Sequence, residues 1–223
     1  DRWVLDNFQK HSYPLGIMVN TDCERFVDEG ADYRNLTYAK YGREIMAQPN
    51  RTAIQIFDQQ TIHRLRDEYR IKEVTKATAN TIEDLAVELD LDPEKLARTV
   101  QDYNDACQGG DYNPSVLDGV TTKGLEVEKT NWALPINQPP YEAYVCTTGI
   151  TFTFGGLQIN TKGEVQDMTD QSIPGLYAAG ELVGGLFYEN YPGGTGLMSG
   201  SVFGKLAGES AAAYCGAEAR AVA

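Results

Sequence analysis

Alternating and helix-spaced hydrophobic residues occupy separate stretches in the first half of the chain. The short apolar run LGIMVN at residues 15–20, then TDCE as a turn and RFVDEG, predicts a β-hairpin. The stretch TAIQIF at residues 52–57 alternates and predicts a further strand. Between them, Leu36, Ala39, Tyr41 and Ile45 follow a loose helical spacing, so we expect a helix within residues 32–48.

The segment at residues 78–107 predicts two helices with explicit start signals. Thr81 stands before an apolar residue, with Asp84 three positions on, which is close to a capping box. Asp92 followed by Pro93 is a typical helix start, because aspartate caps free amides and proline fits the first helical position. We expect this helical pair to serve packing only.

The composition changes near residue 150, after a loop-rich stretch at residues 109–140. Over residues 144–165 we expect a strand, a glycine turn, a second strand and a polar hairpin. The alternation in TFTFGG (151–156) would put Phe152 and Phe154 on one face. The run LYAAGEL then predicts a buried strand, and a helix is expected from near Leu197. We therefore place a domain boundary there, giving residues 1–150 and 151–223.

Two glycine-containing stretches of the second part are candidate ligand sites. A strand that ends at Gly180 and Glu181 allows a ligand to approach its carboxyl end, and the carboxylate can accept hydrogen bonds from ribose hydroxyls. The same dipeptide is more often a simple turn. The glycines before the last helix suit either a phosphate, the electron-rich edge of a flavin, or close packing alone; they are Gly193, Gly194 and Gly196.

An acidic cluster surrounds the first candidate catalytic residues. Asp28, Glu29 and Asp32 lie close in sequence to Tyr33 and Arg34. Such a group is either a surface salt-bridge network or a proton-delivery chain with Arg34 at its head. Spacing alone favours the salt-bridge network.

Charge and composition exclude several classes of function. The formal net charge of −13 argues against nucleic acid and against an anionic membrane surface, because both require a basic face. The two histidines and the four cysteines without paired spacing predict no metal site, and free thiols indicate a cytoplasmic protein. No apolar run approaches the roughly 20 residues that would predict a membrane span.

These motifs in this order resemble the FAD-dependent fumarate reductase/succinate dehydrogenase flavoprotein superfamily. GITFTFGGLQINTKGEV, IPGLYAAGELVGG and FGKLAGESAA are similar to its closing FAD-binding segment, and IMVNTDCERFVDE is similar to the start of its capping domain. QKHSYPLGIMVN, DEGADYRNLTYAKYG and ENYPGGTGLMSG look closest to tricarballylate dehydrogenase-like members. The resemblance implies an α+β capping (catalytic) domain at residues 1–150 and the C-terminal segment of an α/β FAD-binding domain at residues 151–223.

The resemblance also implies roles for individual residues. Arg34 lies within one position of the family's proton-donating arginine, and Tyr33, Glu29 and Tyr191 join it as catalytic candidates. Glu181 would hold the FAD ribose. The flavin itself would lie against the backbone of the remaining candidates: Gly155, Gly156, Gly180, Gly194, Thr195, Gly196, Leu197, Met198 and Ser199.

Two departures from the family pattern weaken fumarate as the substrate. Thr151 and Phe152 stand where fumarate reductases have a histidine, and Tyr191 stands where they have an arginine that clamps the substrate. The resemblance thus implies hydride transfer between FAD N5 and a CH–CH or C=C bond beside a carboxyl or keto group, first in a tricarballylate-like acid. The alternatives are a ketosteroid-type dehydrogenase, favoured by Tyr191, and a non-catalytic module that binds a partner protein.

No GxGxxG fingerprint follows a strand near the start of the chain. Because the family begins with that motif, we expect an N-terminally truncated flavoprotein that lacks the Rossmann portion, binds FAD poorly and is inactive alone. Its expected partners are a small organic acid or keto substrate, the missing portion of the FAD domain and an electron partner of unknown identity.

Overall fold

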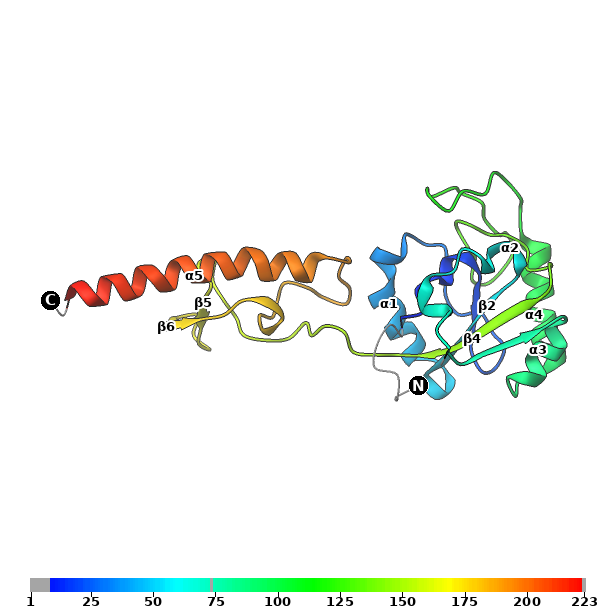
Figure 1. Cartoon of the computed structure of the whole chain (residues 1–223), viewed down its shortest axis with the longest axis horizontal. Coiled ribbons are helices and arrows are strands. Elements are labelled where there is room, and N and C mark those ends of the chain that lie inside the picture. The colour runs from blue at the N-terminus through cyan, green and yellow to red at the C-terminus, as the bar shows by residue number, and fades with distance from the viewer. Residues whose placement is uncertain (1–8, 73, 222–223) are drawn as a thin grey trace. The chain divides into compact units, whose positions relative to one another are not determined.

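The computed structural model describes residues 9–72 and 74–221, with side chains as far as residue 216. The chain forms two compact units, Asp1–Thr148 and Gly149–Ala223, whose elements Figure 1 labels. The fold is mixed α/β with antiparallel sheets. The interpretation of the two units as a cap and an FAD-domain segment remains a prediction.

A four-stranded antiparallel sheet forms the centre of the first unit. Its strands are β1 (Ile17–Val19), β2 (Thr52–Phe57), β4 (Tyr141–Thr147) and β3 (Lys76–Ala79), in that spatial order. The predicted hairpin between β1 and RFVDEG is reduced to a single antiparallel bridge, Val19–Arg25, because β1 pairs along its length with β2 instead. β2 is more apolar than RFVDEG, and β1, which pairs with it, is buried at all three of its residues.

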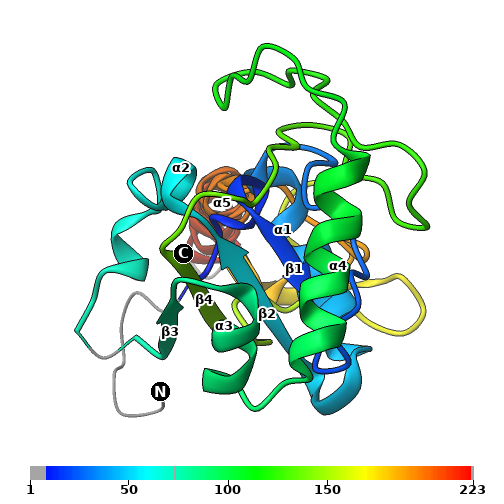
Figure 2. The ribbon, with the colours of Figure 1, turned by 90° about the vertical axis from the view of Figure 1, so that its right-hand side faces the viewer.

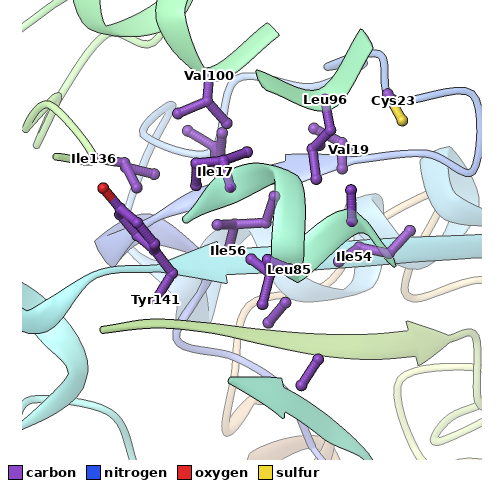
Figure 3. Close-up of a cluster of buried hydrophobic side chains, with 14 of the residues drawn as sticks. Ile17, Val19, Cys23, Ile54, Ile56, Leu85, Leu96, Val100, Ile136 and Tyr141 are labelled. Carbon is purple, nitrogen blue, oxygen red and sulfur yellow. The ribbon is translucent and has the colours of Figure 1, made fainter. Parts of the chain in front are cut away.

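Helices α3 (Ile82–Glu88) and α4 (Pro93–Ala106) cover one face of this sheet (Figure 2). The alternation of β1 and β2 directs Ile17, Val19, Ile54 and Ile56 to this face, where Figure 3 shows them in one cluster with Leu85, Leu96 and Val100. All of these side chains are buried. The two helices therefore cover the main hydrophobic core on this side of the sheet.

Both predicted helix starts of this pair are confirmed. The Thr81 side chain accepts a hydrogen bond from the amide of Asp84 at 3.0 Å, and Asp92 accepts one from the amide of Lys95 at 3.0 Å. Pro93 occupies the first turn of α4, as expected. Local chemistry decides these two boundaries, because each cap satisfies an amide that has no partner inside its own helix.

The opposite face of the sheet carries helix α1 (Arg34–Met46), within the range expected from sequence. Met18 packs there with Tyr13, Val27 and Tyr41. The neighbouring strand residue Gln55 is also buried, and its amide nitrogen donates to the carbonyl of Lys10 at 2.7 Å. This face thus combines packing with satisfied polar groups.

Short helices and one buried lysine, Lys129, lie in the segments that connect the longer elements of this unit. They are the 3-10 helices η1 (Tyr13–Leu15), η2 (Pro49–Arg51) and η3 (Asp67–Tyr69), and the α-helix α2 (Gln59–Ile62). Lys129, 1% exposed, lies in the long loop before β4 and donates from Nζ to the carbonyls of Pro14 at 2.9 Å and Gly16 at 2.6 Å. Those bonds fix η1 against the loop.

The second unit contains a two-stranded antiparallel sheet, β5 (Glu164–Gln166) with β6 (Ser172–Tyr177), then η4 (Gly180–Leu182) and the long helix α5 (Thr195–Ala221). Val165, Ala178 and Val183 form its small core. The helix begins two residues before the expected Leu197, because Gly194 already accepts the amide of Met198.

One strand predicted in this unit is absent, and another exists but is not buried. Residues 151–156 form no strand, since their backbone bonds instead with residues 182–185; Leu157 donates to the carbonyl of Leu182, and Gly185 to that of Phe154. The strand expected to be buried and to end at Gly180 and Glu181 is β6, which ends at Tyr177 and is largely exposed within the unit. Gly180 and Glu181 belong to η4 instead.

No helix in residues 9–72 or 74–221 combines the length and apolar character that crossing a membrane requires.

Replacing Lys129 with methionine should lower the free energy of unfolding by roughly 2 kcal/mol, because the carbonyls of Pro14 and Gly16 then stay buried without a donor. Urea denaturation at pH 7 measures this difference. The control is Lys123→Met on the same loop, where the lysine side chain is exposed and no loss is expected. Equal midpoints for the two variants would contradict the bridging role of Lys129.

Candidate functional site

A cavity of about 540 Å³ opens in the first unit, among η1, the start of α1, the turn after α2 and the long loop. Its wall is rich in cationic and aromatic side chains and contains no acidic residue among those that the structure describes. The lining residues that matter most are His11, Tyr33, Arg34, Arg64, Arg66 and Trp132. This cavity is the candidate substrate site.

The start of helix α1 places Arg34 and Tyr33 at the cavity. Arg34 is the first helical residue and Tyr33 is the N-cap, with extended backbone (φ −56°, ψ 141°). The Tyr13 hydroxyl, hydrogen-bonded to Thr37 at 2.7 Å, anchors this turn to η1. Because the first turn of α1 contains no acid, a cation and the positive end of the helix dipole stand together, which disfavours folding but attracts anions.

The guanidinium groups of the cavity differ in their partners. Arg66 donates to Glu68 from Nε at 3.1 Å and from Nη2 at 2.9 Å. Neither the half-buried Arg34 nor the exposed Arg64 makes a side-chain hydrogen bond or ion pair with any described residue. Two of the three cations therefore have no anionic partner in the described part of the chain.

The imidazole of His11 is held neutral at this wall. Burial, followed by the charges of Arg34 and Arg66, lowers the pKa of His11 from 6.5 to about 4. The ring lies 5.1 Å from that of Tyr38, centroid to centroid, and its buried Nδ1 has no hydrogen-bond partner in the described structure. A ligand group or a water molecule can supply the missing hydrogen bond to such an atom.

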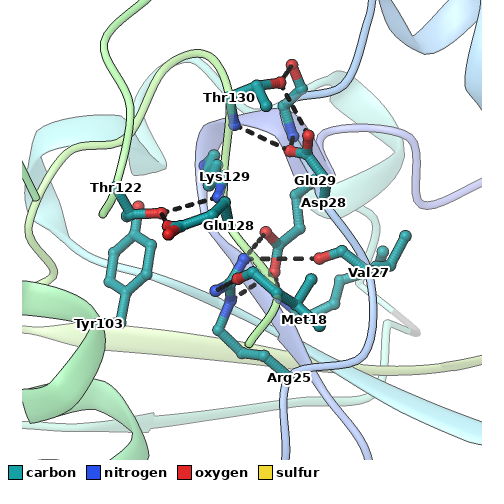
Figure 4. Close-up of polar contacts among 12 residues, drawn as sticks. Met18, Arg25, Val27, Asp28, Glu29, Tyr103, Thr122, Glu128, Lys129 and Thr130 are labelled. Carbon is teal, nitrogen blue, oxygen red and sulfur yellow. Dashed lines mark hydrogen bonds and ion pairs between the residues drawn. The ribbon is translucent and has the colours of Figure 1, made fainter. Parts of the chain in front are cut away.

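Glu29 lies in a buried network rather than at the cavity (Figure 4). It forms an ion pair with Arg25, whose Nη2 lies 2.6 Å from Oε2, and it accepts the amide of Met18 at 2.7 Å. Arg25 also donates to the carbonyl of Val127 at 2.7 Å and lies over the ring of Tyr103. This network joins β1, the following turn and the long loop.

The expected carboxylate chain around Arg34 is not formed among the described residues. Asp28 accepts from the amide of Gly30 and from Thr130, and Asp32 accepts from the amide of Tyr33. Of the four residues predicted to be catalytic, the cavity thus brings together Arg34 and Tyr33. The surface salt-bridge alternative is also wrong for Glu29, whose pair with Arg25 is buried.

The second unit places Tyr191 in an aromatic cluster with Phe152, Phe154 and Phe187. The Tyr191 and Phe152 rings lie 5.0 Å apart, and the Tyr191 hydroxyl is 3.4 Å from that of Thr151. The cluster brings together the positions of both departures from the family pattern. Sequence reasoning expected Phe152 and Phe154 on one face, and both contact Tyr191, although the backbone there is not a strand.

The candidate glycines fall into two groups. A Cβ on Gly156 would stand 2.3 Å from the carbonyl oxygen of Leu182, and one on Gly196 would stand 2.6 Å from the Phe152 ring, so internal packing requires both. Gly155, Gly180 and Gly194 face open space, and the last two have positive φ. Only the second group leaves backbone accessible to a ligand.

The remaining candidates surround that open backbone. Glu181, on η4, is exposed and accepts the amide of Thr153 through Oε1 at 2.8 Å, while its Oε2 makes no hydrogen bond with the described residues. Leu197 and Met198 are 77% and 59% exposed at the start of α5, Ser199 is half-buried, and Thr195 caps the turn by donating to Pro192. The arrangement is an exposed helix start beside an exposed carboxylate.

Sequence reasoning missed His11, Arg64 and Arg66. Arg64 and Arg66 lie two positions apart in HRLRDEYR, where alternating charges are typical of a solvated surface. His11 was considered only as a metal ligand. The tertiary structure alone brings these residues to Arg34.

Comparison with known proteins identifies relatives across nearly the whole chain. The family model described as "FAD binding domain" matches residues 8–197. The fumarate reductase (cytochrome) of Shewanella frigidimarina is 34% identical over 200 residues, covering 89% of this chain and 32% of the relative. The chain thus spans about a third of the length of such relatives.

Two solved structures share the fold. An open conformation of a flavocytochrome c3 fumarate reductase is 31% identical with a TM-score of 0.66, covering 92% of this chain and 34% of the other. A 3-ketosteroid Δ1-dehydrogenase from Sterolibacterium denitrificans, in complex with 1,4-androstadiene-3,17-dione, is 25% identical with a TM-score of 0.66, covering 92% and 40%.

The depressed pKa of His11 predicts a specific loss of stability in acid. An unfolded histidine takes up a proton near pH 6.5 and the folded His11 only near pH 4, so its contribution is complete above pH 6.5 and declines as the pH falls toward 4. Partial exposure reduces the effect to on the order of 1 kcal/mol. The charged groups that act on it are Lys10, Arg34, Arg66 and Glu68.

Urea denaturation of wild type and His11→Asn at pH 7 and pH 5 measures this effect. The variant should lose less stability between the two pH values than wild type. The exposed His63 provides a matched control, and His63→Asn should retain the wild-type decline. A decline that His11→Asn leaves unchanged would exclude a neutral, buried His11.

Proposed function

The chain belongs to the FAD binding domain family, whose cofactor is FAD, and from that premise we propose that it acts in a flavin-dependent oxidoreductase. The reaction that we propose interconverts a CH–CH and a C=C bond next to a carboxyl group. One observation supports this above all: the cavity in the first unit presents Arg34 and Arg64 without anionic partners among the described residues.

The residues of the second unit fit a flavin nucleotide. Gly155, Gly180 and Gly194 offer open backbone, and the exposed start of α5 offers amides to an electron-rich group. The Oε2 atom of Glu181 is available for a ribose hydroxyl. We propose these residues, with Thr195, Leu197, Met198 and Ser199, as the FAD contacts; Gly156 and Gly196 support them by packing.

When bound, FAD would supply or accept the hydride, while residues of this chain would bind the substrate carboxyl group and transfer the proton. In our proposal Arg34 first binds the substrate carboxyl region and then exchanges a proton with the carbon next to the hydride acceptor. Tyr33 shapes the wall beside it, with its ring 5.9 Å from that of Trp132. Glu29 acts indirectly, since it fixes Arg25 and β1 beneath this turn.

An organic acid fits the cavity better than a steroid. Guanidinium groups without partners favour carboxylates, whereas a neutral ketosteroid would leave these charges uncompensated. The identity to the fumarate reductase structure, 31%, also exceeds the 25% to the ketosteroid dehydrogenase. Because Phe152 and Tyr191 replace the expected histidine and arginine, we propose a tricarballylate-like acid rather than fumarate as the substrate.

We further propose that the first unit is the substrate-binding cap and the second a segment of the FAD domain, with an electron partner outside this chain. The competing function is a non-catalytic module that binds a partner protein. Absorbance of the complete gene product separates the two, since an oxidised flavin gives a yellow protein. A folded but colourless product that takes up no FAD would exclude the enzyme.

Replacing Glu181 with glutamine should weaken FAD binding about tenfold, because an amide accepts a ribose hydroxyl less strongly than a carboxylate. Fluorescence titration of FAD into the flavin-free complete protein measures the affinity. Glu209→Gln on α5 is the control, since Glu209 is exposed and far along the helix from its start. Unchanged affinity in Glu181→Gln would remove Glu181 from the FAD site.

Replacing Arg34 with lysine should lower kcat by roughly 10²–10⁴-fold, because the proton donor then loses its position and geometry. Stopped-flow absorbance of flavin reoxidation by an unsaturated tricarboxylic acid measures the rate in the complete protein. Arg98→Lys on the exposed side of α4 is the matched control. Wild-type turnover in Arg34→Lys would rule out proton transfer by Arg34.

A further inference from the structure

Residues 130–132 of the long loop, which we call the strap, lie beside residues 28–33, the turn that leads into α1. Contacts join the two segments in the same order along both. They are Thr130 with Asp28, Asn131 with Gly30, and the ring of Trp132 with that of Tyr33. The next residue of the chain is Arg34, the first residue of α1 and the candidate proton donor.

Asp28 and Thr130 are joined by a double hydrogen bond (Figure 4). The amide of Thr130 donates to Oδ1 of Asp28 at 3.1 Å, and its hydroxyl donates to Oδ2 at 2.8 Å. Oδ1 of Asp28 also accepts the amide of Gly30 at 2.9 Å, and the carbonyl of Asp28 accepts the hydroxyl of Tyr41 on α1. One aspartate therefore connects the strap, the turn and the helix.

The strap packs directly against the turn at Gly30. A Cβ at that position would stand 2.2 Å from the carbonyl oxygen of Asn131, so a side chain has no room there. The Asn131 amide nitrogen donates to the carbonyl of Gly30 at 2.8 Å, and the Thr130 hydroxyl lies 3.1 Å from the same oxygen. Close packing and hydrogen bonds thus fix the distance between the two backbones.

The guanidinium of Arg34 depends on this turn for its position. Its side chain makes no hydrogen bond or ion pair with a described residue, and its backbone carbonyl lies 3.4 Å from the Tyr13 hydroxyl. The backbone that leads into α1 therefore decides where the side chain begins. A displacement of about 1 Å at a reacting group can slow a reaction on the order of 10²-fold.

We propose that Asp28 and Thr130 are positioning residues for Arg34, which hold the start of α1 where the guanidinium can exchange a proton with the substrate. Neither residue lines the cavity, so both act through the turn and not by touching a ligand. This inference rests on the proposed function, because it explains how Arg34 is placed for that reaction.

The test compares Thr130→Val, which removes the hydroxyl and keeps the shape of the side chain, with Thr130→Ser, which keeps the hydroxyl. In the complete protein with FAD, Thr130→Val should lower kcat for an unsaturated tricarboxylic acid roughly tenfold to hundredfold and change KM by less than about twofold. Its solvent deuterium isotope effect on kcat should rise, because proton transfer becomes the slowest step. Thr130→Ser should recover most of the wild-type kcat.

Thr147→Val is the matched control. Thr147 is exposed at the end of β4, and its hydroxyl donates to the carbonyl of Arg51 at 2.7 Å. The variant thus removes the same kind of hydrogen bond away from the start of α1, and it should keep the wild-type kcat. Urea denaturation establishes that both valine variants are folded.

Two further measurements separate positioning from a general loss of stability. Asp28→Ala combined with Thr130→Val should lose little more kcat than Asp28→Ala alone, because both changes break the same contact. Hydrogen–deuterium exchange needs no turnover: the amides of residues 30–36 should exchange faster in Thr130→Val than in wild type or Thr147→Val.

Several results would overturn the inference alone. They are a wild-type kcat or isotope effect in Thr130→Val, an equal loss of kcat in Thr147→Val, additive losses in the double variant, or unchanged exchange at residues 30–36. If the complete protein with FAD turns over no unsaturated acid, the proposed oxidoreductase is overturned instead. Faster exchange in Thr130→Val would then still identify Asp28 and Thr130 as the residues that hold the turn.

Discussion

The buried ion pair between Arg25 and Glu29 is the interaction on which the geometry of the first unit depends. Its side chains are 6% and 0% exposed, and each charge is satisfied further by backbone: Met18 donates to Glu29, and Arg25 donates to Val127. A buried pair of this kind contributes little net stability against a hydrophobic replacement, but loss of one partner leaves an uncompensated charge. Its role is to position the chain, because this cluster connects the edge strand β1, the turn before α1 and the long loop.

The cavity depends on that arrangement because none of its walls belongs to the sheet itself. Its residues come from η1, the first turn of α1, the turn after α2 and the loop before β4. Lys129 fixes η1 to the loop through two carbonyls, and Tyr13 fixes η1 to α1 through Thr37. Loops held by buried polar bonds can present unpaired cations at a stable site, whereas the packed strands supply rigidity beneath them.

The two units differ in how they use glycine and aromatic residues. In the second unit Gly156 and Gly196 allow close packing against Leu182 and Phe152, and the ring of Tyr191 completes the cluster. Open backbone remains at Gly155, Gly180 and Gly194, beside the exposed Glu181. The pair Gly155 and Gly156 and the pair Gly194 and Gly196 thus each contain one position required by packing and one that is open, which spacing does not separate.

The sequence by itself determined the features that depend on neighbouring residues. The caps at Thr81 and Asp92, the alternation that divides β1 and β2 between two faces, and the order of motifs that identifies a FAD-binding family are all local or linear properties. The tertiary structure decided the pairing of β1 with β2, the pairing of Glu29 with Arg25 rather than with Arg34, and the meeting of Arg34 with His11 and Arg64. The residues in those contacts are far apart in sequence, so helical or strand periodicity does not relate them. Long-range packing and the need to pair buried charges bring them together.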